Sequence, residues 1–147
     1  MSSIKLRYDV DGADFVSCGK ASEDVKRTLK NIGMPPDVIR RVAIAMYEGE
    51  INMVIHAGGG QIDVDIAPDA VRMVLKDQGP GIQDISLAMQ AGWSTAPDDV
   101  RSLGFGAGMG LPNMKKYTDE MKIESTVGVG TTVSMTVFTH PQEEAVS

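Results

Sequence analysis

One short stretch, Asp77-Gln78-Gly79-Pro80-Gly81, constrains the fold more than any other part of this 147-residue chain. It follows the apolar run Val71–Leu75, which is typical of a buried β-strand. Its two glycines allow the backbone to take a positive φ or to approach a ligand closely. The sequence therefore predicts a carboxylate, Asp77, at a strand end, where it can accept hydrogen bonds from a molecule above the sheet. An ordinary turn explains these five residues equally well.

A β-hairpin is predicted to deliver Asp77. Gln61–Ala67 alternates apolar and polar residues, and Pro68-Asp69 turns the chain into Val71–Lys76. Three further strands are predicted, over Ile4–Val10, Lys122–Thr126 and Thr131–Phe138.

Helical periodicity appears in the first third of the chain. Asp14 is predicted to cap a helix that runs to about Ile32 and ends at Gly33. Cys18 lies on its apolar stripe and is predicted to be a core residue rather than a reactive one. The whole stripe consists of Phe15, Cys18, Val25, Leu29 and Ile32. Shorter helices are predicted over Asp84–Ala91 and Leu111–Glu120.

A second long helix, from about Asp37 to Ala57, carries polar residues among apolar ones. Glu48 and Asn52, four residues apart, share the side opposite to the apolar residues Ile39, Val42, Met46 and Met53. The pair fits either a solvated edge with a side-chain hydrogen bond, or a site where Asn52 offers oxygen to a hard cation and Glu48 acts as a base. Glu50, about 200° around the helix from Glu48, is expected to face elsewhere and to tolerate alanine.

Glycine occupies every second position from Gly104 to Gly110. Such a segment can wrap an anion with its backbone N–H groups, assisted by the start of the helix that follows. A flexible linker is disfavoured inside one small domain. Neither G-x-x-x-x-G-K-[ST] nor G-x-G-x-x-G matches, and the catalytic-loop and D-F-G patterns of protein kinases are absent from the sequence.

Composition narrows the function classes. The net charge of −6 makes nucleic acid an unsuitable partner, because phosphate binding needs clustered Lys and Arg. No apolar run is long enough to span a membrane, and the N-terminus lacks the apolar core of a signal peptide, so a cytoplasmic protein is predicted. Its single cysteine excludes an internal disulfide. The length predicts one domain over residues 1–147.

Four stretches together resemble, in order, the four motifs of the Bergerat ATP-binding fold, which the GHKL superfamily of gyrase-type ATPases and histidine kinases shares. They are Glu48-x-x-x-Asn52, Asp77-x-Gly79-x-Gly81, the Gly104–Gly110 segment and Gly128-x-Gly130-Thr131. Within this superfamily the chain is similar to small bacterial serine/threonine kinases of the anti-sigma-factor and stress-switch type. That likeness is carried by 77–85, 92–95 and 108–112.

The resemblance implies a two-layer α/β sandwich, with a mixed, mainly antiparallel sheet covered on one face by helices. It implies binding of ATP and Mg²⁺, with Glu48 as the catalytic base, Asn52 as a Mg²⁺ ligand and Asp77 as the partner of the adenine amino group. It also implies a lid over the phosphates at 104–110 and support of the adenine pocket by Thr131. The nucleotide-binding residues implied are Asn52, Asp77, Gly79, Gly81, Ile82, Gly104, Gly106, Ala107, Gly108, Met109, Gly110, Leu111 and Thr131.

Members of this kinase group phosphorylate a Ser or Thr of a small STAS-domain protein, the anti-sigma-factor antagonist. The resemblance therefore implies the same reaction in a bacterial partner-switching pathway. Two alternatives stay open: an anti-sigma factor that acts by sequestering a sigma factor, and a nucleotide-gated binding module with negligible phosphoryl transfer. Whether the protein forms a homodimer is also left open.

Overall fold

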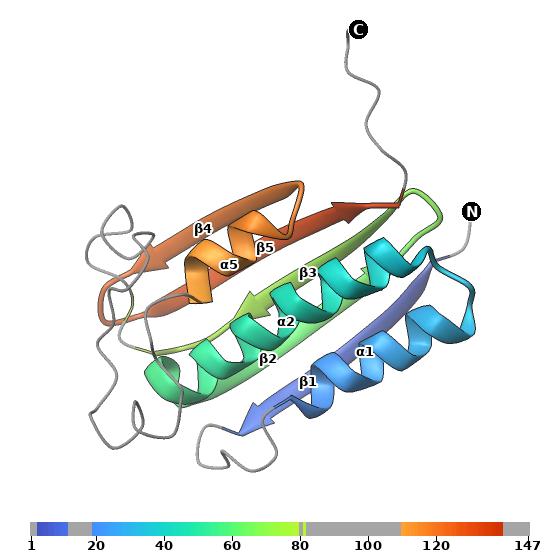
Figure 1. Ribbon diagram of the computed structural model, residues 1–147. Helices are drawn as coiled ribbons and strands as arrows, with labels where there is room; N and C mark the ends of the chain where they lie inside the picture. Colours follow the sequence, from blue (N-terminus) through green and yellow to red (C-terminus); the bar gives the residue numbers. More distant parts are fainter. Residues whose placement is uncertain (1–2, 12–18, 80, 82–109, 140–147) are drawn as a thin grey trace, which may run out of the picture.

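The computed structural model describes residues 3–11, 19–79, 81 and 110–139, which form two layers (Figure 1). The strands are β1 (Ile4–Asp11), β2 (Gly59–Ile66), β3 (Ala70–Lys76), β4 (Glu120–Thr126) and β5 (Gly130–Phe138). They form one sheet in the order β1-β2-β3-β5-β4. The helices α1 (Lys20–Asn31), α2 (Pro36–Ala57) and α5 (Gly110–Lys116) cover one face of it. The predicted two-layer α/β sandwich is confirmed. All pairs of neighbouring described strands are antiparallel, so no mixed pairing occurs among them.

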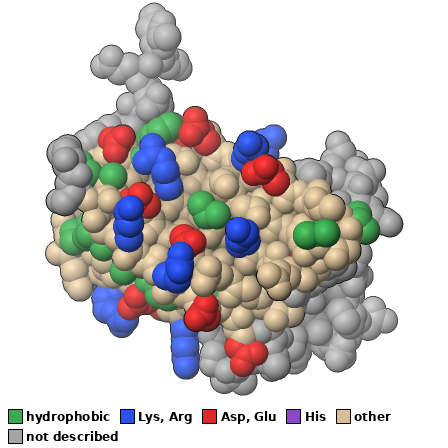
Figure 2. Space-filling view, turned by 180° about the vertical axis from the view of Figure 1, so that it is seen from behind, with side chains coloured by type: hydrophobic (Ala, Val, Ile, Leu, Met, Phe, Trp, Pro, Cys, Tyr) green, Lys and Arg blue, Asp and Glu red, His purple; other side chains and the backbone are tan. Residues whose placement is uncertain are grey.

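The core lies between the sheet and the helices. Alternate residues of each strand point toward the helices, as Ile62, Val64 and Ile66 of β2 do. Leu29 of α1 and Met46 of α2 meet them and are fully buried. Lys, Arg, Asp and Glu side chains are interspersed on the opposite face (Figure 2), where Arg7 Nε lies 2.7 Å from Asp63 Oδ1. In the described part of the chain, no helix is long and apolar enough to cross a membrane.

The first helix differs from its predicted boundaries. It begins at Lys20, after Gly19 in a left-handed conformation, and not at Asp14. Asp14, Phe15 and Cys18 lie outside the described residues. Ile32 is 46% exposed, since the helix ends one residue earlier and the chain turns away at Gly33. The buried positions Val25 and Leu29 confirm the rest of the predicted stripe.

The N-terminus of α1 is capped by a side chain from α2, Glu50. Its Oε2 accepts hydrogen bonds from the N–H groups of Gly19 (2.9 Å) and Ala21 (3.2 Å), and its Oε1 accepts one from Ser22 (3.1 Å). Glu50 is 3% exposed, and Gly19 supplies no side-chain cap. Glu50 therefore fixes α1 against α2. The expectation that alanine is harmless here does not fit these buried contacts.

A second contact joins α1 to the sheet. The hydroxyl of Tyr8 on β1 donates to Asp24 Oδ2 at 2.5 Å, and Arg27 Nη2 lies 2.7 Å from Asp24 Oδ1. Burial and the bond to Asp24 raise the pKa of Tyr8. The bond from Tyr8 and the one from Arg27 lower the pKa of Asp24 below its ordinary value of 3.8. Because the pKa of Asp24 is lower in the folded protein, its contribution to stability is lost as the pH falls through the folded-state pKa.

Tyr8→Phe is expected to lower the free energy of unfolding at pH 7 by about 1 kcal/mol, because a hydrogen bond to a half-exposed carboxylate is lost. As the pH falls through the lowered folded-state pKa of Asp24, its carboxylate becomes protonated and the loss should become smaller. Urea unfolding at a series of pH values from 7 downward measures the difference. A loss that stays equal at every pH would contradict a role for the charge of Asp24.

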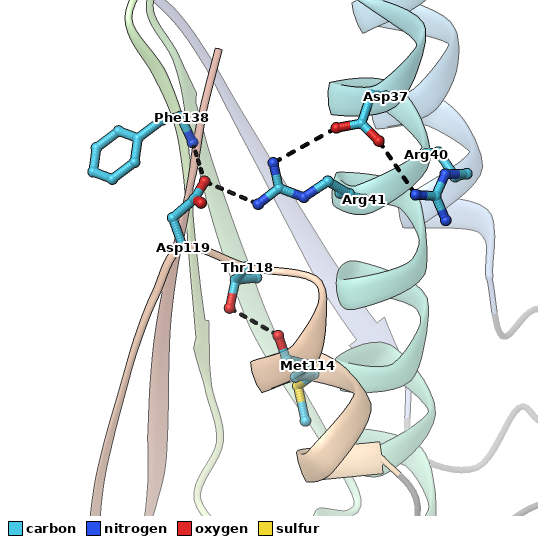
Figure 3. Close-up of polar contacts among 7 residues, drawn as sticks. All are labelled: Asp37, Arg40, Arg41, Met114, Thr118, Asp119 and Phe138. Carbon is cyan, nitrogen blue, oxygen red and sulfur yellow. Dashed lines mark hydrogen bonds and ion pairs between the residues drawn. The ribbon is translucent and has the colours of Figure 1, made fainter. Parts of the chain in front are cut away.

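The end of α5 also differs from prediction. The hydroxyl of Thr118 donates to the carbonyl oxygen of Met114 at 2.8 Å and satisfies a backbone group in the last turn (Figure 3). The helix therefore ends at Lys116, and Glu120 already belongs to β4, whereas the sequence predicted a helix up to Glu120.

Asp119 ties the chain after α5 to both layers (Figure 3). Its Oδ2 accepts a hydrogen bond from the N–H of Phe138 on β5 at 2.7 Å and lies 3.0 Å from Arg41 Nη2 on α2. Arg41 in turn lies 3.8 Å from Asp37, in the first turn of α2. The C-terminal end of α5 is thus held next to the N-terminal half of α2.

Candidate functional site

Glu48 and Asn52 lie one turn apart on α2, and both are half-buried. The predicted helix is confirmed, so the two side chains leave the same side of it. Glu48 Oε2 accepts a hydrogen bond from Nδ2 of Asn113 on α5, at 2.7 Å. The polar side of α2 thus faces α5 at Glu48.

Gly49 lets α2 approach the sheet closely beside Glu48. A Cβ at this position would collide with Cδ2 of Leu75 and lie 3.3 Å from Sδ of Met114. Leu75 stands two residues before Asp77 on β3. The close approach therefore places Gly49, the residue after Glu48, against the strand that leads into Asp77.

Asp77 joins the ends of β3 and β5. Its Oδ1 accepts hydrogen bonds from the N–H groups of Gly79 (2.9 Å) and Thr131 (3.1 Å). The N–H of Asp77 donates to the carbonyl oxygen of Thr131 at 2.9 Å. The predicted position of Asp77, at a strand end and entering a turn, is confirmed.

Two glycines let the Asp77 turn pack directly on the hairpin between β4 and β5. Gly81 has φ 80°, and an added Cβ would lie 2.5 Å from the carbonyl oxygen of Thr126. Gly130 has φ 151°, and a Cβ there would collide with the carbonyl oxygen of Asp77. In the structure, the close approach that these glycines allow is backbone against backbone. The side chain of Thr131 is buried, with Oγ1 2.9 Å from Ser125 Oγ.

Part of the predicted site cannot be placed. The helix predicted over Asp84–Ala91 lies outside the described residues. Gly110 begins α5, and Leu111 is half-buried and packs on the core. The predicted site residues outside the described part are Ile82, Gly104, Gly106, Ala107, Gly108 and Met109.

The sequence did not point to Asn113 as part of this site. Its bond to Glu48 joins residues 65 positions apart, and no periodicity within a helix reports such a contact. One signal was available: Asn113 directly follows 108–112, one of the stretches that carried the resemblance.

Comparisons of the sequence with known proteins agree on a family. Residues 13–137 match the family described as histidine kinase-like ATPase domain. The chain is 32% identical over 112 residues to the serine/threonine-protein kinase RsbT of Bacillus subtilis, covering 74% of this chain and 78% of RsbT. It is 33% identical over 105 residues to the anti-sigma F factor of Caldanaerobacter subterraneus, covering 68% and 70%. The predicted class, an ATP-using serine/threonine kinase of the anti-sigma-factor type, is confirmed.

A solved structure supports the same fold. The crystal structure of the RsbU and RsbW domains of Rv1364c from Mycobacterium tuberculosis superposes with a TM-score of 0.60 at 19% identity. The match covers 91% of this chain and 31% of that longer chain, so it is evidence for the fold alone. With the family match over 13–137 and the two curated relatives, the chain belongs to the histidine kinase-like ATPase family.

Proposed function

We propose that this protein is an ATP-dependent serine/threonine protein kinase that phosphorylates a STAS-domain anti-sigma-factor antagonist. The observation that carries the proposal is the close packing of α2 at Gly49, the residue after Glu48, against Leu75 of the strand that leads into Asp77. The Glu48 carboxylate suits proton transfer, and the Asp77 carboxylate suits recognition of the adenine ring. The names of the relatives, a serine/threonine-protein kinase and an anti-sigma factor, support the reaction class.

Asp77 is the residue that would recognise adenine. Among the described residues, both hydrogen bonds to its carboxylate end on Oδ1. Oδ2 is thus the oxygen that can accept a hydrogen bond from the exocyclic amine of ATP. Gly79, Gly81 and Thr131 would shape the pocket around it. Contacts of ATP with Ile82 and with residues 104–109 stay predictions from the sequence.

Asn52 offers an oxygen of the kind that a hard cation prefers. Within the described ranges, no group of three His, Cys, Asp or Glu side chains could hold a metal ion. A single protein oxygen fits Mg²⁺, which commonly takes most of its ligands from nucleotide phosphates and water. When bound, Mg²⁺ neutralises charge on the phosphates.

Glu48 would act on the acceptor. As the Ser or Thr oxygen forms its bond to the γ-phosphorus and the bond to the ADP oxygen breaks, the hydroxyl proton passes to the Glu48 carboxylate. A single carboxylate suffices, because positioning and charge neutralisation supply most of the catalysis in phosphoryl transfer.

A second function, binding of a sigma factor, is favoured by the relatives named anti-sigma F factor. Binding of a sigma factor is compatible with phosphorylation of an antagonist, since one protein can have both activities. A cytoplasmic location and a single domain stay predictions from the sequence, and homodimer formation stays an open question.

Incubation with Mg²⁺, [γ-³²P]ATP and each STAS-domain protein of the same genome tests the proposal. Transfer of label to one of these proteins is the expected result. Absence of label on all of them, together with capture of a sigma factor in a pull-down, would instead support the second function. If the protein is instead a nucleotide-gated binding module, it should bind ATP but neither transfer label nor capture a sigma factor.

Asp77→Asn is expected to weaken ATP binding by roughly tenfold or more, since a hydrogen bond to a charged acceptor contributes about 1.5–3 kcal/mol. Asparagine can keep the acceptor that binds Gly79 and Thr131 while placing an NH₂ where Oδ2 stood. The fold should therefore persist. Calorimetry with ATP and GTP measures the effect, and the wild type should bind GTP poorly. Equal affinities of the wild type for both nucleotides would refute the role of Asp77.

A further inference from the structure

We propose that Asn113 is a positioning residue for phosphoryl transfer: its side-chain amide holds the Glu48 carboxylate in the orientation that accepts the hydroxyl proton. The inference rests on the proposed role of Glu48 as the base. It adds a residue from α5, outside the helix that carries Glu48 and Asn52.

The hydrogen bond itself defines the role. Nδ2 of Asn113 lies 2.7 Å from Oε2 of Glu48, and both residues are half-buried. An ionised carboxylate only accepts hydrogen bonds, so the amide must present its NH₂ group and not its oxygen. Fixing Oε2 restricts the rotation of the carboxylate and leaves Oε1 as the oxygen that can take a proton.

A neutral amide suits this task better than a charged side chain. A Lys or Arg at this position would form an ion pair with Glu48 and stabilise its charge, which makes a carboxylate a weaker base. The amide orients Glu48 without adding a counter-charge. Charge-assisted hydrogen bonds of this kind are short and directional.

The helix that carries Asn113 is fixed at several points. The next residue, Met114, is 1% exposed and would lie 3.3 Å from a Cβ at Gly49. Thr118 bonds to the carbonyl oxygen of Met114, and Asp119 ties the following residues to Arg41 of α2 (Figure 3). The amide of Asn113 is thus presented to Glu48 from a backbone packed against α2 itself. Such support is what holds a reacting group in a productive geometry.

The test is a double-mutant cycle of Asn113→Ala and Glu48→Gln. The rate is measured under single-turnover conditions as loss of label from Mg-[γ-³²P]ATP, to protein or to water, with the STAS-domain proteins of the same genome present. N113A alone is expected to lower this rate about 10–100-fold, as a misplaced catalytic group does. In the E48Q background it should change the rate by less than about twofold, because no base remains to be positioned. Affinity for a non-hydrolysable ATP analogue should stay near the wild-type value.

Two further variants separate positioning from packing. Asn113→Asp matches the native side chain in shape, yet two carboxylates at this distance cannot both stay ionised and would share a proton. It should therefore be at least as slow as N113A, whereas a packing role predicts near-native activity. Lys116→Ala, an exposed change in the same helix, is the matched control. Thermal melts identify the folded variants, and the isosteric N113D carries the test if N113A is unfolded.

Activity of N113A and N113D within about twofold of wild type would overturn the inference. The inference would also be overturned if N113A lowered the rate of the E48Q variant by the same factor as it lowers the rate of the wild type, since the two residues would then act independently. Normal activity of E48Q alone has a different consequence: it would refute the proposed role of Glu48 in transfer.

Discussion

Glu48→Gln is expected to slow phosphoryl transfer about 10²–10⁴-fold, the usual cost of removing a general base, and to change ATP affinity by no more than about twofold. Glutamine keeps the length of the side chain and an oxygen that can accept the bond from Asn113, but it cannot take up the hydroxyl proton. The rate is measured by transfer of label from [γ-³²P]ATP, and the affinity by calorimetry with a non-hydrolysable analogue.

Asn52→Ala is the companion change that separates binding from chemistry. It removes the proposed Mg²⁺ ligand, so metal-dependent binding of ATP and transfer should fall together. Glu50, two residues after Glu48, is unsuitable as an inert control, because it holds the start of α1. A Glu48 variant with normal transfer, or with ATP affinity reduced as strongly as transfer, would contradict its role as the base.

Glu50→Ala is expected to lower the free energy of unfolding by about 3–5 kcal/mol. Three backbone N–H groups, of Gly19 before α1 and of Ala21 and Ser22 in its first turn, lose a shared acceptor in a buried place, and each unsatisfied donor costs about 1–3 kcal/mol before relaxation. This is a large part of the total stability of a domain of this size, about 5–15 kcal/mol. The melting temperature should fall by about 10 °C.

Urea unfolding followed by circular dichroism measures the change in free energy. Glu50→Gln is the matched control: it keeps the shape and one acceptor oxygen but removes the charge, so it should be destabilised by an intermediate amount. If the alanine variant is as stable as the wild type, Glu50 does not act as the cap of α1.

Elements determined by local pattern could be predicted from the sequence. The alternation in Gln61–Ala67 gave β2 nearly in full, and the helix predicted from about Asp37 begins one residue earlier, at Pro36. Asp77 was placed correctly because the end of an apolar strand and the glycines after it are adjacent in the chain. The signals in these cases lie within a few residues of one another.

Features that depend on distant partners could not be predicted in this way. Glu50 is buried only because α1 packs beside it, and the N–H groups that bind it are 28–31 positions away in the sequence. The end of α5 depends on Asp119, whose N–H bonds to the carbonyl oxygen of Thr136 on β5. The sequence predicted a helix up to Glu120, but in the structure Glu120 begins β4 and pairs with β5.

The strand order also determines when the proposed site can form during synthesis of the chain. β5 is the last described strand in the chain, yet it lies between β3 and β4. The donor from Thr131 reaches Asp77 across 54 positions, and Asn113 reaches Glu48 across 65. A chain still emerging from the ribosome therefore exposes both carboxylates before these distant donors exist. The proposed ATP site is complete only when residue 131 has left the exit tunnel, so nucleotide cannot assist the folding of the segments made before it.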